Sequence, residues 1–172
     1  SLGEPSERLI RDKGLAPFVG RGQKLLEAYG GRILHPVDLA VEGEERVEIG
    51  LGDLPAERLL VDVGEQTIAR YVDVIQGAAT LFVNGPAGVY EQPLSAVGTE
   101  RLWRAIANAR GYSVIGGGDS VAAAGRFGLR ERFDYVCTSG GGMVRYLSGQ
   151  PLPVVEALRR AAQRQQAGGA ER

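Results

Sequence analysis

Two short segments of this chain combine residue types that could hold a phosphate group. Residues 84–91 read Asn-Gly-Pro-Ala-Gly-Val-Tyr-Glu after the apolar run 81–83, and residues 116–120 read Gly-Gly-Gly-Asp-Ser after Ser-Val-Ile at 113–115. In each segment a β-like stretch leads into a glycine turn with one carboxylate, and a helical pattern follows. Glycine turns at strand ends that face helix N-termini present backbone N–H groups to phosphate oxygens. We therefore expect both segments to line a phosphate or nucleotide site.

A third turn of the same kind, Thr-Ser-Gly-Gly-Gly at residues 138–142, follows the strand-like residues 135–137. The carboxyl ends of parallel strands meet at one edge of a sheet, so the three turns are predicted to face a single ligand. Gly140, Gly141 and Gly142 would then direct a second helix N-terminus at a transferring phosphoryl group, where charge develops.

The side chains around these glycines predict more specific contacts. Asp119, at the start of a helix, is placed to hold a Mg²⁺ ion that bridges phosphates, and Ser120 could offer a hydroxyl to a phosphate. Glu91 could accept both hydrogen bonds of a ribose diol, while Pro86 and Val89 offer apolar surface to a base or sugar.

Each of these features also has a purely structural interpretation. A triple glycine is commonly only a tight turn, Asp119 alone is compatible with an ordinary helix N-cap, and Glu91 alone with a solvated carboxylate. Asp62, which ends a predicted strand, could form a turn or line the site. His35 and Cys137 lack the sequence neighbours that a zinc site or a catalytic thiol needs.

Three widespread motifs are absent from the sequence. It contains no Gly-x-x-x-x-Gly-Lys-Ser/Thr loop, no Gly-x-Gly-x-x-Gly between a strand and a helix, and no Gly-x-Ser-x-Gly turn. These absences count against a Walker-type phosphate loop, a dinucleotide enzyme and a hydrolase with a serine elbow.

An alternation of strands and helices must position the three turns. Short apolar runs, each followed by a helical pattern, predict a buried parallel sheet with right-handed crossovers. The predicted fold class is therefore α/β, a doubly wound, mainly parallel sheet with Rossmann-like three-layer architecture. The predicted strands span 59–63, 80–83, 112–115 and 135–137, and the helices that follow them span 65–76, 98–109, 120–127 and 141–147.

The segments on either side of this alternation are predicted from local patterns. A last amphipathic helix begins after Pro153, and the polar residues 163–172 are expected to fray. The upstream part is predicted to contain helices at 7–13 and 18–29, a short strand at 32–34, and a hairpin of 37–41 with 46–49.

Composition bounds the class of protein. The 172 residues carry a formal net charge of −1, so no basic field favours a nucleic-acid partner or an anionic membrane surface. No apolar run approaches the roughly 20 residues that span a bilayer. We expect one domain of a soluble, cytoplasmic protein. Its opening at Ser1 instead of Met suggests a fragment.

Taken in order, the three turns resemble the C-terminal, nucleotide-binding part of phosphoglycerate kinase. Residues 84–91 are similar to that family's Asn-Gly-Pro-Met/Ala-Gly-Val-Phe-Glu, residues 116–120 to its Gly-Gly-Gly-Asp-Thr/Ser, and residues 138–142 to its Ser-Thr-Gly-Gly-Gly. Ala87 and the Gly-Glu-Pro opening resemble archaeal members. One departure is Glu65, which stands where the family usually has proline after Asp-Ile/Val-Gly.

The resemblance implies phosphoryl transfer between 1,3-bisphosphoglycerate and Mg-ADP, giving 3-phosphoglycerate and ATP, with Mg²⁺ as cofactor. It also implies that residues 1–172 form a partial nucleotide-binding domain, incomplete at its N-terminal side. The family's phosphoglycerate site and catalytic arginine belong to an N-terminal domain without a counterpart here. The isolated chain is then expected to be inactive, and the alternative function is a non-catalytic, stand-alone nucleotide-binding module.

The residues implied by the resemblance fall into two groups. Those expected to contact ADP or ATP are Asn84, Gly85, Pro86, Gly88, Val89, Glu91, Gly116, Gly117, Gly118, Asp119 and Ser120, with Asp119 also as the metal ligand. Those expected to face the transferring group are Gly118, Gly140, Gly141 and Gly142.

Overall fold

The computed structural model describes residues 1–169 of the chain, and the side chains of residues 1–164. Its first part contains helices α1 (Glu4–Asp12) and α2 (Ala16–Tyr29), followed by a 3-10 turn at Gly30–Arg32. Proline stands in the first turn of both helices, where its missing N–H is not needed. Both predicted helices are confirmed. The strand predicted at 32–34 is wrong, because these residues belong to the 3-10 turn and to irregular backbone.

An antiparallel sheet comes next, with strands β1 (Asp38–Val41), β2 (Val47–Gly50) and β3 (Leu60–Val63) in the order β2-β1-β3. The predicted hairpin is confirmed, since Val41 pairs with Val47 across the turn. A short 3-10 turn at Leu51–Asp53 leads from β2 toward β3.

A separate parallel sheet contains β4 (Thr80–Asn84), β5 (Tyr112–Gly116) and β6 (Tyr135–Cys137), in the order β4-β5-β6. Asn84 pairs with Gly116, and Gly116 pairs with Cys137, so the three carboxyl ends are level with one another. The α/β class with a parallel sheet is confirmed.

The strand predicted at 59–63 exists, but it does not belong to the parallel sheet. As β3 it pairs antiparallel with β1, with Leu39 opposite Val63. β1 offers β3 backbone partners along a short ladder with a register shift between Ala40 and Val41, and the local strand pattern contains no information on which partner strand is chosen.

Three helices cover one face of the parallel sheet: α3 (Glu65–Gly77), α4 (Val97–Asn108) and α5 (Gly118–Arg126). Their apolar side chains meet Val83 and Ile115 from the strands, in a core that includes Ile68, Leu102 and Trp103. Complete burial of one such side chain stabilises the fold by about 1.5–3 kcal/mol. This core fixes the strand ends from which the glycine turns depart. Short 3-10 turns lie at Pro93–Ser95 and Arg130–Arg132.

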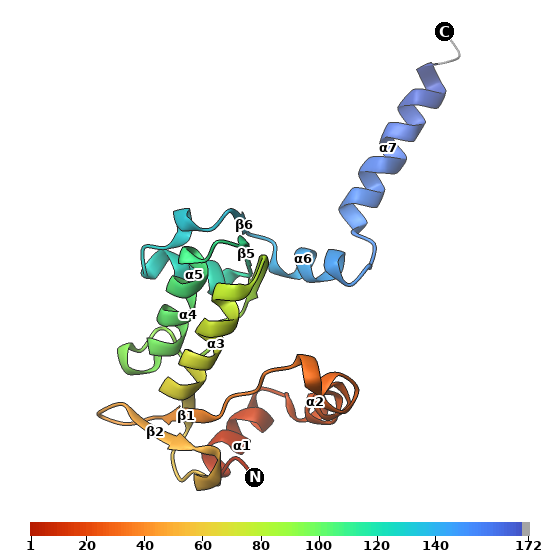
Figure 1. The fold of residues 1–172 in the computed structure, drawn as a ribbon. Helices are drawn as coiled ribbons and strands as arrows, with labels where there is room; N and C mark the ends of the chain where they lie inside the picture. Colours follow the sequence, from red (N-terminus) through yellow and green to blue (C-terminus); the bar gives the residue numbers. More distant parts are fainter. Residues whose placement is uncertain (170–172) are drawn as a thin grey trace.

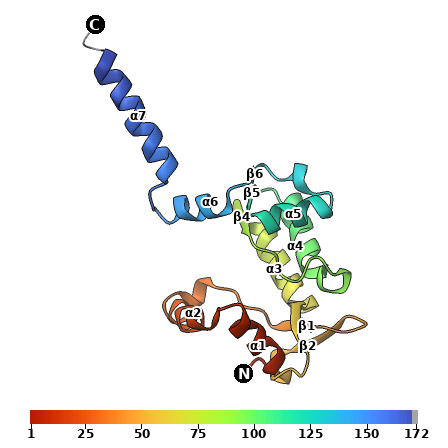
Figure 2. The ribbon, with the colours of Figure 1, turned by 180° about the vertical axis from the view of Figure 1, so that it is seen from behind.

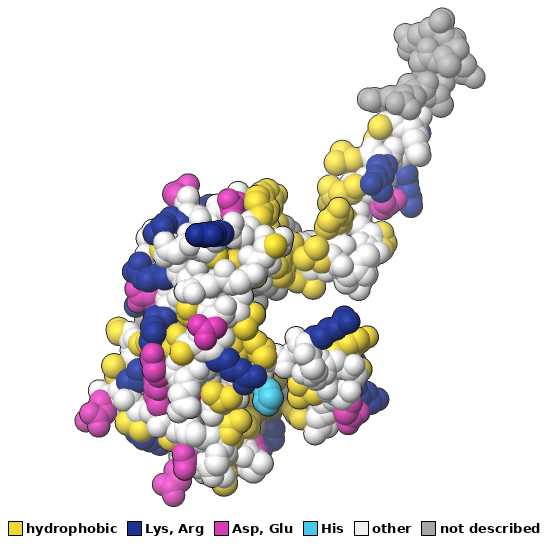
Figure 3. Space-filling model, in the orientation of Figure 1, with side chains coloured by type: hydrophobic (Ala, Val, Ile, Leu, Met, Phe, Trp, Pro, Cys, Tyr) yellow, Lys and Arg dark blue, Asp and Glu magenta, His cyan; other side chains and the backbone are white. Residues whose placement is uncertain are grey.

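The opposite face of the parallel sheet is only partly covered. Helix α6 (Gly140–Leu147) places Met143 against Gly116, while Phe82 and Tyr135 remain 45% and 53% exposed. Apolar side chains gather around this region in the space-filling view (Figure 3). A doubly wound arrangement is therefore present only in part within the described residues.

Helix α7 (Pro153–Gly169) extends away from the body of the molecule (Figures 1 and 2). Fraying of residues 163–172 stays a prediction, and residues 170–172 lie outside the described part of the chain. Of the helices in that part, none has the length and apolar character needed to cross a membrane.

Candidate functional site

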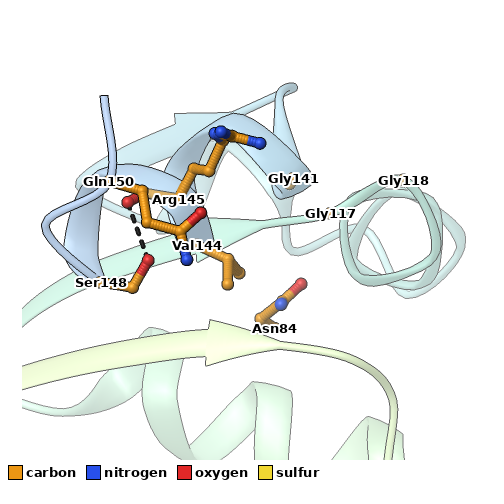
Figure 4. A pocket seen from close by; sticks show the side chains of 9 residues that line it. Asn84, Gly117, Gly118, Gly141, Val144, Arg145, Ser148 and Gln150 are labelled. Carbon is orange, nitrogen blue, oxygen red and sulfur yellow. Dashed lines mark hydrogen bonds between the residues drawn. The ribbon is translucent and has the colours of Figure 1, made fainter. Parts of the chain in front are cut away.

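The three glycine turns line one hollow at the carboxyl edge of the parallel sheet. Its volume is about 480 Å³, and Figure 4 shows Asn84 projecting from β4 toward it. The turns contribute Asn84, Gly117, Gly118, Gly140 and Gly141, and the end of α6 and the segment after it contribute Val144, Arg145, Ser148 and Gln150. The prediction that the three turns share one edge is confirmed.

Two of the glycines are required because other atoms of the three turns pack directly against their backbone. Gly117 has a φ of +95°, and a Cβ atom placed on it would lie 2.5 Å from Oδ1 of Asn84. A Cβ on Gly140 would lie 2.6 Å from the Cα of Gly117. Any side chain at these positions would push the turns apart.

Gly118 and Gly141 differ from their neighbours. A Cβ atom on either would meet nothing within 4 Å, although both residues line the hollow. They lie in the first turns of α5 and α6, whose N-caps Gly117 and Ser139 make no side-chain cap hydrogen bond. The first N–H groups of a helix have no partner within the helix, so this edge has donors available for an anion.

Ser120 ties two of the turns together. It is fully buried, and its Oγ accepts a 2.6 Å hydrogen bond from the N–H of Gly85. Its carbonyl accepts a hydrogen bond from the indole of Trp103 at 3.3 Å. The hydroxyl thus already has a partner in the protein, and its contact with a phosphate stays a prediction.

Asp119 is not the cap of α5. It is the second residue of the helix, it is exposed, and its carboxylate makes none of the side-chain hydrogen bonds found among the described residues. The interpretation as an ordinary N-cap is therefore wrong. Within residues 1–169, no three His, Cys, Asp or Glu side chains gather as a metal-binding group. A single carboxylate fits a Mg²⁺ ion held jointly with phosphate oxygens, which is how this ion is often bound.

The segment from Pro86 to Glu91 lies beside the hollow and does not line it. The N–H groups of Ala87 and Gly88 donate to the buried Oγ1 of Thr99 at 3.1 and 3.2 Å, and the N–H of Val89 donates to the Val61 carbonyl at 2.9 Å. These bonds fix the segment, while the side chains of Val89 and Glu91 remain exposed.

Glu91 and Asp119 lie on the same side of the molecule. Desolvation, followed by the negative charges of Glu91 and Asp119, raises the pKa of the Tyr90 hydroxyl. Both carboxylates are thus close enough to act on one phenol. This placement agrees with the expected common edge, and it leaves their roles toward a ligand as predictions.

Sequence reasoning missed Arg145 as a lining residue. It considered cations only inside the glycine turns, whereas Arg145 is one helical turn beyond Gly141 on α6 and lines the same hollow. Its Nε donates to the Pro151 carbonyl at 3.2 Å, and none of the ion pairs among the described side chains includes it. The i, i+4 spacing from Gly141 is the signal that could have identified it.

Glu65, which stands where the family that the sequence resembles usually has proline, makes local contacts that proline could not make. Glu65 begins α3, and its N–H donates to Oε2 of Glu48 at 2.8 Å, which a proline could not do. Its side chain forms an exposed ion pair with Arg101. Glu65 therefore links α3 to the hairpin and to α4, and it does not line the hollow.

Comparisons with known proteins place these features in a family. The sequence model of the family described as phosphoglycerate kinase matches residues 9–150. The chain is 42% identical over 159 residues to phosphoglycerate kinase of Methanobacterium bryantii, and 40% identical over 158 residues to that of Methanopyrus kandleri. These matches cover 92% and 91% of this chain but 39% of each relative.

A solved structure supports the same relationship. The crystal structure of phosphoglycerate kinase from Pyrococcus horikoshii superposes with a TM-score of 0.86 at 33% sequence identity, covering 95% of this chain and 41% of that one. The chain thus spans about two fifths of the length of its relatives. Because both its sequence and its fold match, the chain belongs to the phosphoglycerate kinase family.

Proposed function

We propose that the hollow at the edge of the parallel sheet binds the phosphates of Mg-ADP or Mg-ATP. The observation that carries this proposal is the pair Gly118 and Gly141, which line one hollow and have no packing contact that requires glycine. Their absent side chains leave the backbone of two helix N-termini open to a ligand. Each N-terminus carries roughly half a positive charge, which favours an anion.

The polar groups around the hollow complement this backbone. Arg145 adds a cation from α6, and the exposed carboxylate of Asp119 at the start of α5 is suited to a Mg²⁺ ion that accompanies the phosphates. The ion would neutralise phosphate charge as the phosphoryl group moves. Val89 and Glu91, exposed beside the hollow, are suited to the nucleoside part.

The activity we propose for the whole protein is phosphoryl transfer between 1,3-bisphosphoglycerate and ADP in the cytoplasm. This chain would supply the nucleotide half of the site. Because it spans 39% of the length of its relatives, the phosphoglycerate site and further cations are expected from the rest of their length. The 172-residue chain alone should then show no measurable turnover with ATP and 3-phosphoglycerate. Robust turnover would contradict this division of the site.

Calorimetric titration with Mg-ADP tests the phosphate site. Gly118→Ala and Gly141→Ala should each weaken binding by about tenfold or more, because a methyl group would occupy the space of a phosphate oxygen, and about 1.4 kcal/mol corresponds to a factor of ten. Neither should reduce stability, since each Cβ points into open space.

Gly125→Ala is the matched control. Gly125 lies on the exposed side of the same helix α5, and its Cβ would also meet nothing within 4 Å. It should raise stability by about 1 kcal/mol through helix propensity and leave Mg-ADP affinity unchanged. Unchanged affinity in both hollow-lining variants would refute the proposed phosphate site.

A further inference from the structure

A buried carboxylate connects the antiparallel sheet to helix α4. Asp62 in β3 is 4% exposed, and its Oδ2 accepts hydrogen bonds from the N–H of Gly98 at 2.8 Å and from Arg46 at 2.9 Å. Its Oδ1 accepts a third bond from the N–H of Val63 at 2.9 Å. Gly98 lies in the first turn of α4, so Asp62 binds the start of that helix to the antiparallel sheet.

Arg46 completes this connection with all three of its side-chain nitrogens. Besides contacting Asp62, it donates to the Leu94 carbonyl at 2.7 Å and to the Val63 carbonyl at 2.7 Å, while its Nε donates to Glu48 at 2.7 Å. The rigid planar fork of arginine can make these bonds simultaneously, whereas a lysine ammonium cannot.

Both ends of the segment 88–98 therefore lie against Asp62. A Cβ on Gly88 would lie 2.5 Å from Oδ1 of Asp62, and one on Gly98 would lie 2.3 Å from the same atom. Between these two contacts the segment carries Val89 and Glu91 with exposed side chains. The position of these side chains beside the hollow thus depends on two residues that do not line it.

We propose that Arg46 and Asp62 are positioning residues, which hold the segment 88–98 so that Val89 and Glu91 contact the nucleoside part of the bound nucleotide. This inference rests on the proposed function. It goes beyond that function because neither residue touches the hollow: Asp62 lies in β3, and Arg46 lies in the hairpin turn directly before β2. The phosphate subsite, built on α5 and α6, should be independent of the pair.

The test compares two ligands. ADP needs both the phosphate subsite and the segment 88–98, whereas pyrophosphate needs only the phosphate subsite; both are titrated into the 172-residue chain with Mg²⁺. The variants are Arg46→Lys, which keeps the charge and loses the fork, and Asp62→Asn, which keeps the shape. Amide hydrogen exchange at Val89 and Gly98 without ligand gives an independent readout of segment order.

Asp38→Asn provides a matched control. Asp38 is also a buried carboxylate of the antiparallel sheet, at 3% exposure, and it accepts N–H bonds from Gln66 and Thr67 at the start of α3. Like Asp62, it accepts N–H groups at the start of a helix, but its bonds do not reach the segment 88–98. Any general loss of stability should therefore appear in all three variants.

We expect Arg46→Lys and Asp62→Asn to weaken ADP binding by about tenfold and to speed exchange at Val89 and Gly98 by a similar factor, the effect of losing one charged hydrogen bond. Pyrophosphate affinity should stay within about twofold. Asp38→Asn should leave the ratio of the two affinities unchanged. An equal loss of ADP and pyrophosphate affinity, or unchanged exchange at Val89 and Gly98, would overturn the positioning role. If the unmodified chain binds neither ligand, the proposed function fails and this inference fails with it.

Discussion

The starts of helices α3 and α4 differ from those of α5 and α6 in whether a side chain of the protein accepts their N–H groups. In the antiparallel sheet, buried carboxylates of Asp38 and Asp62 accept the N–H groups that begin α3 and α4. At the edge of the parallel sheet, α5 and α6 begin at glycine turns without a side-chain cap. Side chains of the protein accept N–H groups at the starts of α3 and α4, whereas no side-chain cap is present at the starts of α5 and α6, as the proposed phosphate site requires.

The two carboxylates also differ from each other. Burial disfavours the ionised form of Asp38, but hydrogen bonds from Thr67 and from the N–H groups of Gln66 and Thr67 outweigh it and hold its pKa below the usual value. At Asp62 burial dominates and raises the pKa, despite the N–H of Gly98 and the guanidinium of Arg46. Of the two, Asp62 is therefore the first to take up a proton on acidification.

The largest effect should come from neighbouring glycines at the parallel edge. Gly117→Ala forces an alanine into a positive φ and against Asn84, so the free energy of unfolding should fall by about 3 kcal/mol. Gly118→Ala, one residue further, should leave it unchanged or slightly raised. Urea unfolding of both variants measures the difference. Equal effects would mean that neither the positive φ of Gly117 nor its contact with Asn84 constrains the turn.

The next largest effect on stability should come from a buried carboxylate of the antiparallel sheet. Asp38→Asn should lower the free energy of unfolding by about 2 kcal/mol at neutral pH, because a buried charged acceptor is lost. A carboxyl group with a lowered pKa stabilises the fold above its unfolded pKa, and this contribution disappears as pH falls through the folded pKa. The difference between parent and variant should therefore shrink on acidification.

For Asp62, acidification should change the contribution to the free energy of unfolding in the opposite direction. Because its folded pKa is raised, the folded protein binds this proton before the unfolded chain does, so acidification between the raised and the ordinary pKa favours the fold. Asp62→Asn should abolish that contribution. Urea unfolding of both variants from neutral pH to about pH 3 separates the two carboxylates. Parallel pH profiles would show that their environments are equivalent.

At the open edge, Asp119→Asn should weaken binding of Mg-ADP by about tenfold and leave binding of metal-free ADP unchanged or improved. Stability should not change, since Asp119 is not the helix cap. Titrations with and without Mg²⁺, beside a thermal melt, measure these quantities. Equal affinities of variant and parent for Mg-ADP would exclude a role in holding the ion.

The smallest effect should come from Arg145→Gln. Arg145 is exposed and lines the hollow, so removing its charge should weaken pyrophosphate binding by only about threefold. The loss should diminish at high salt, because exposed charges are screened. Arg159→Gln on α7, which does not line the hollow, is the control. Identical behaviour of the two variants would show that Arg145 acts only through net charge.

The sequence predicted those features of the fold that are determined by residues adjacent along the chain. The strand ends before Asn84 and Gly116 were predictable because the apolar run, the turn glycines and the following helix are adjacent in sequence. Pairing of β3 with β1 was not, because the choice of strand partner depends on contacts distant along the chain. The hydroxyl of Ser120 was assigned to a ligand, since its bond to Gly85 spans 35 residues and leaves no local pattern.

The glycine turns at the edge of the parallel sheet also affect the conformational entropy that is lost on binding an anion. A lysine that binds a phosphate gives up as much as about 2 kcal/mol of rotamer freedom. Gly117, Gly118, Gly140 and Gly141 have no side-chain torsions to lose, and the packing of Gly140 on Gly117 already fixes their backbone. In a chain whose lysines are only Lys13 and Lys24, anion binding at this edge would thus begin from a backbone ordered during folding.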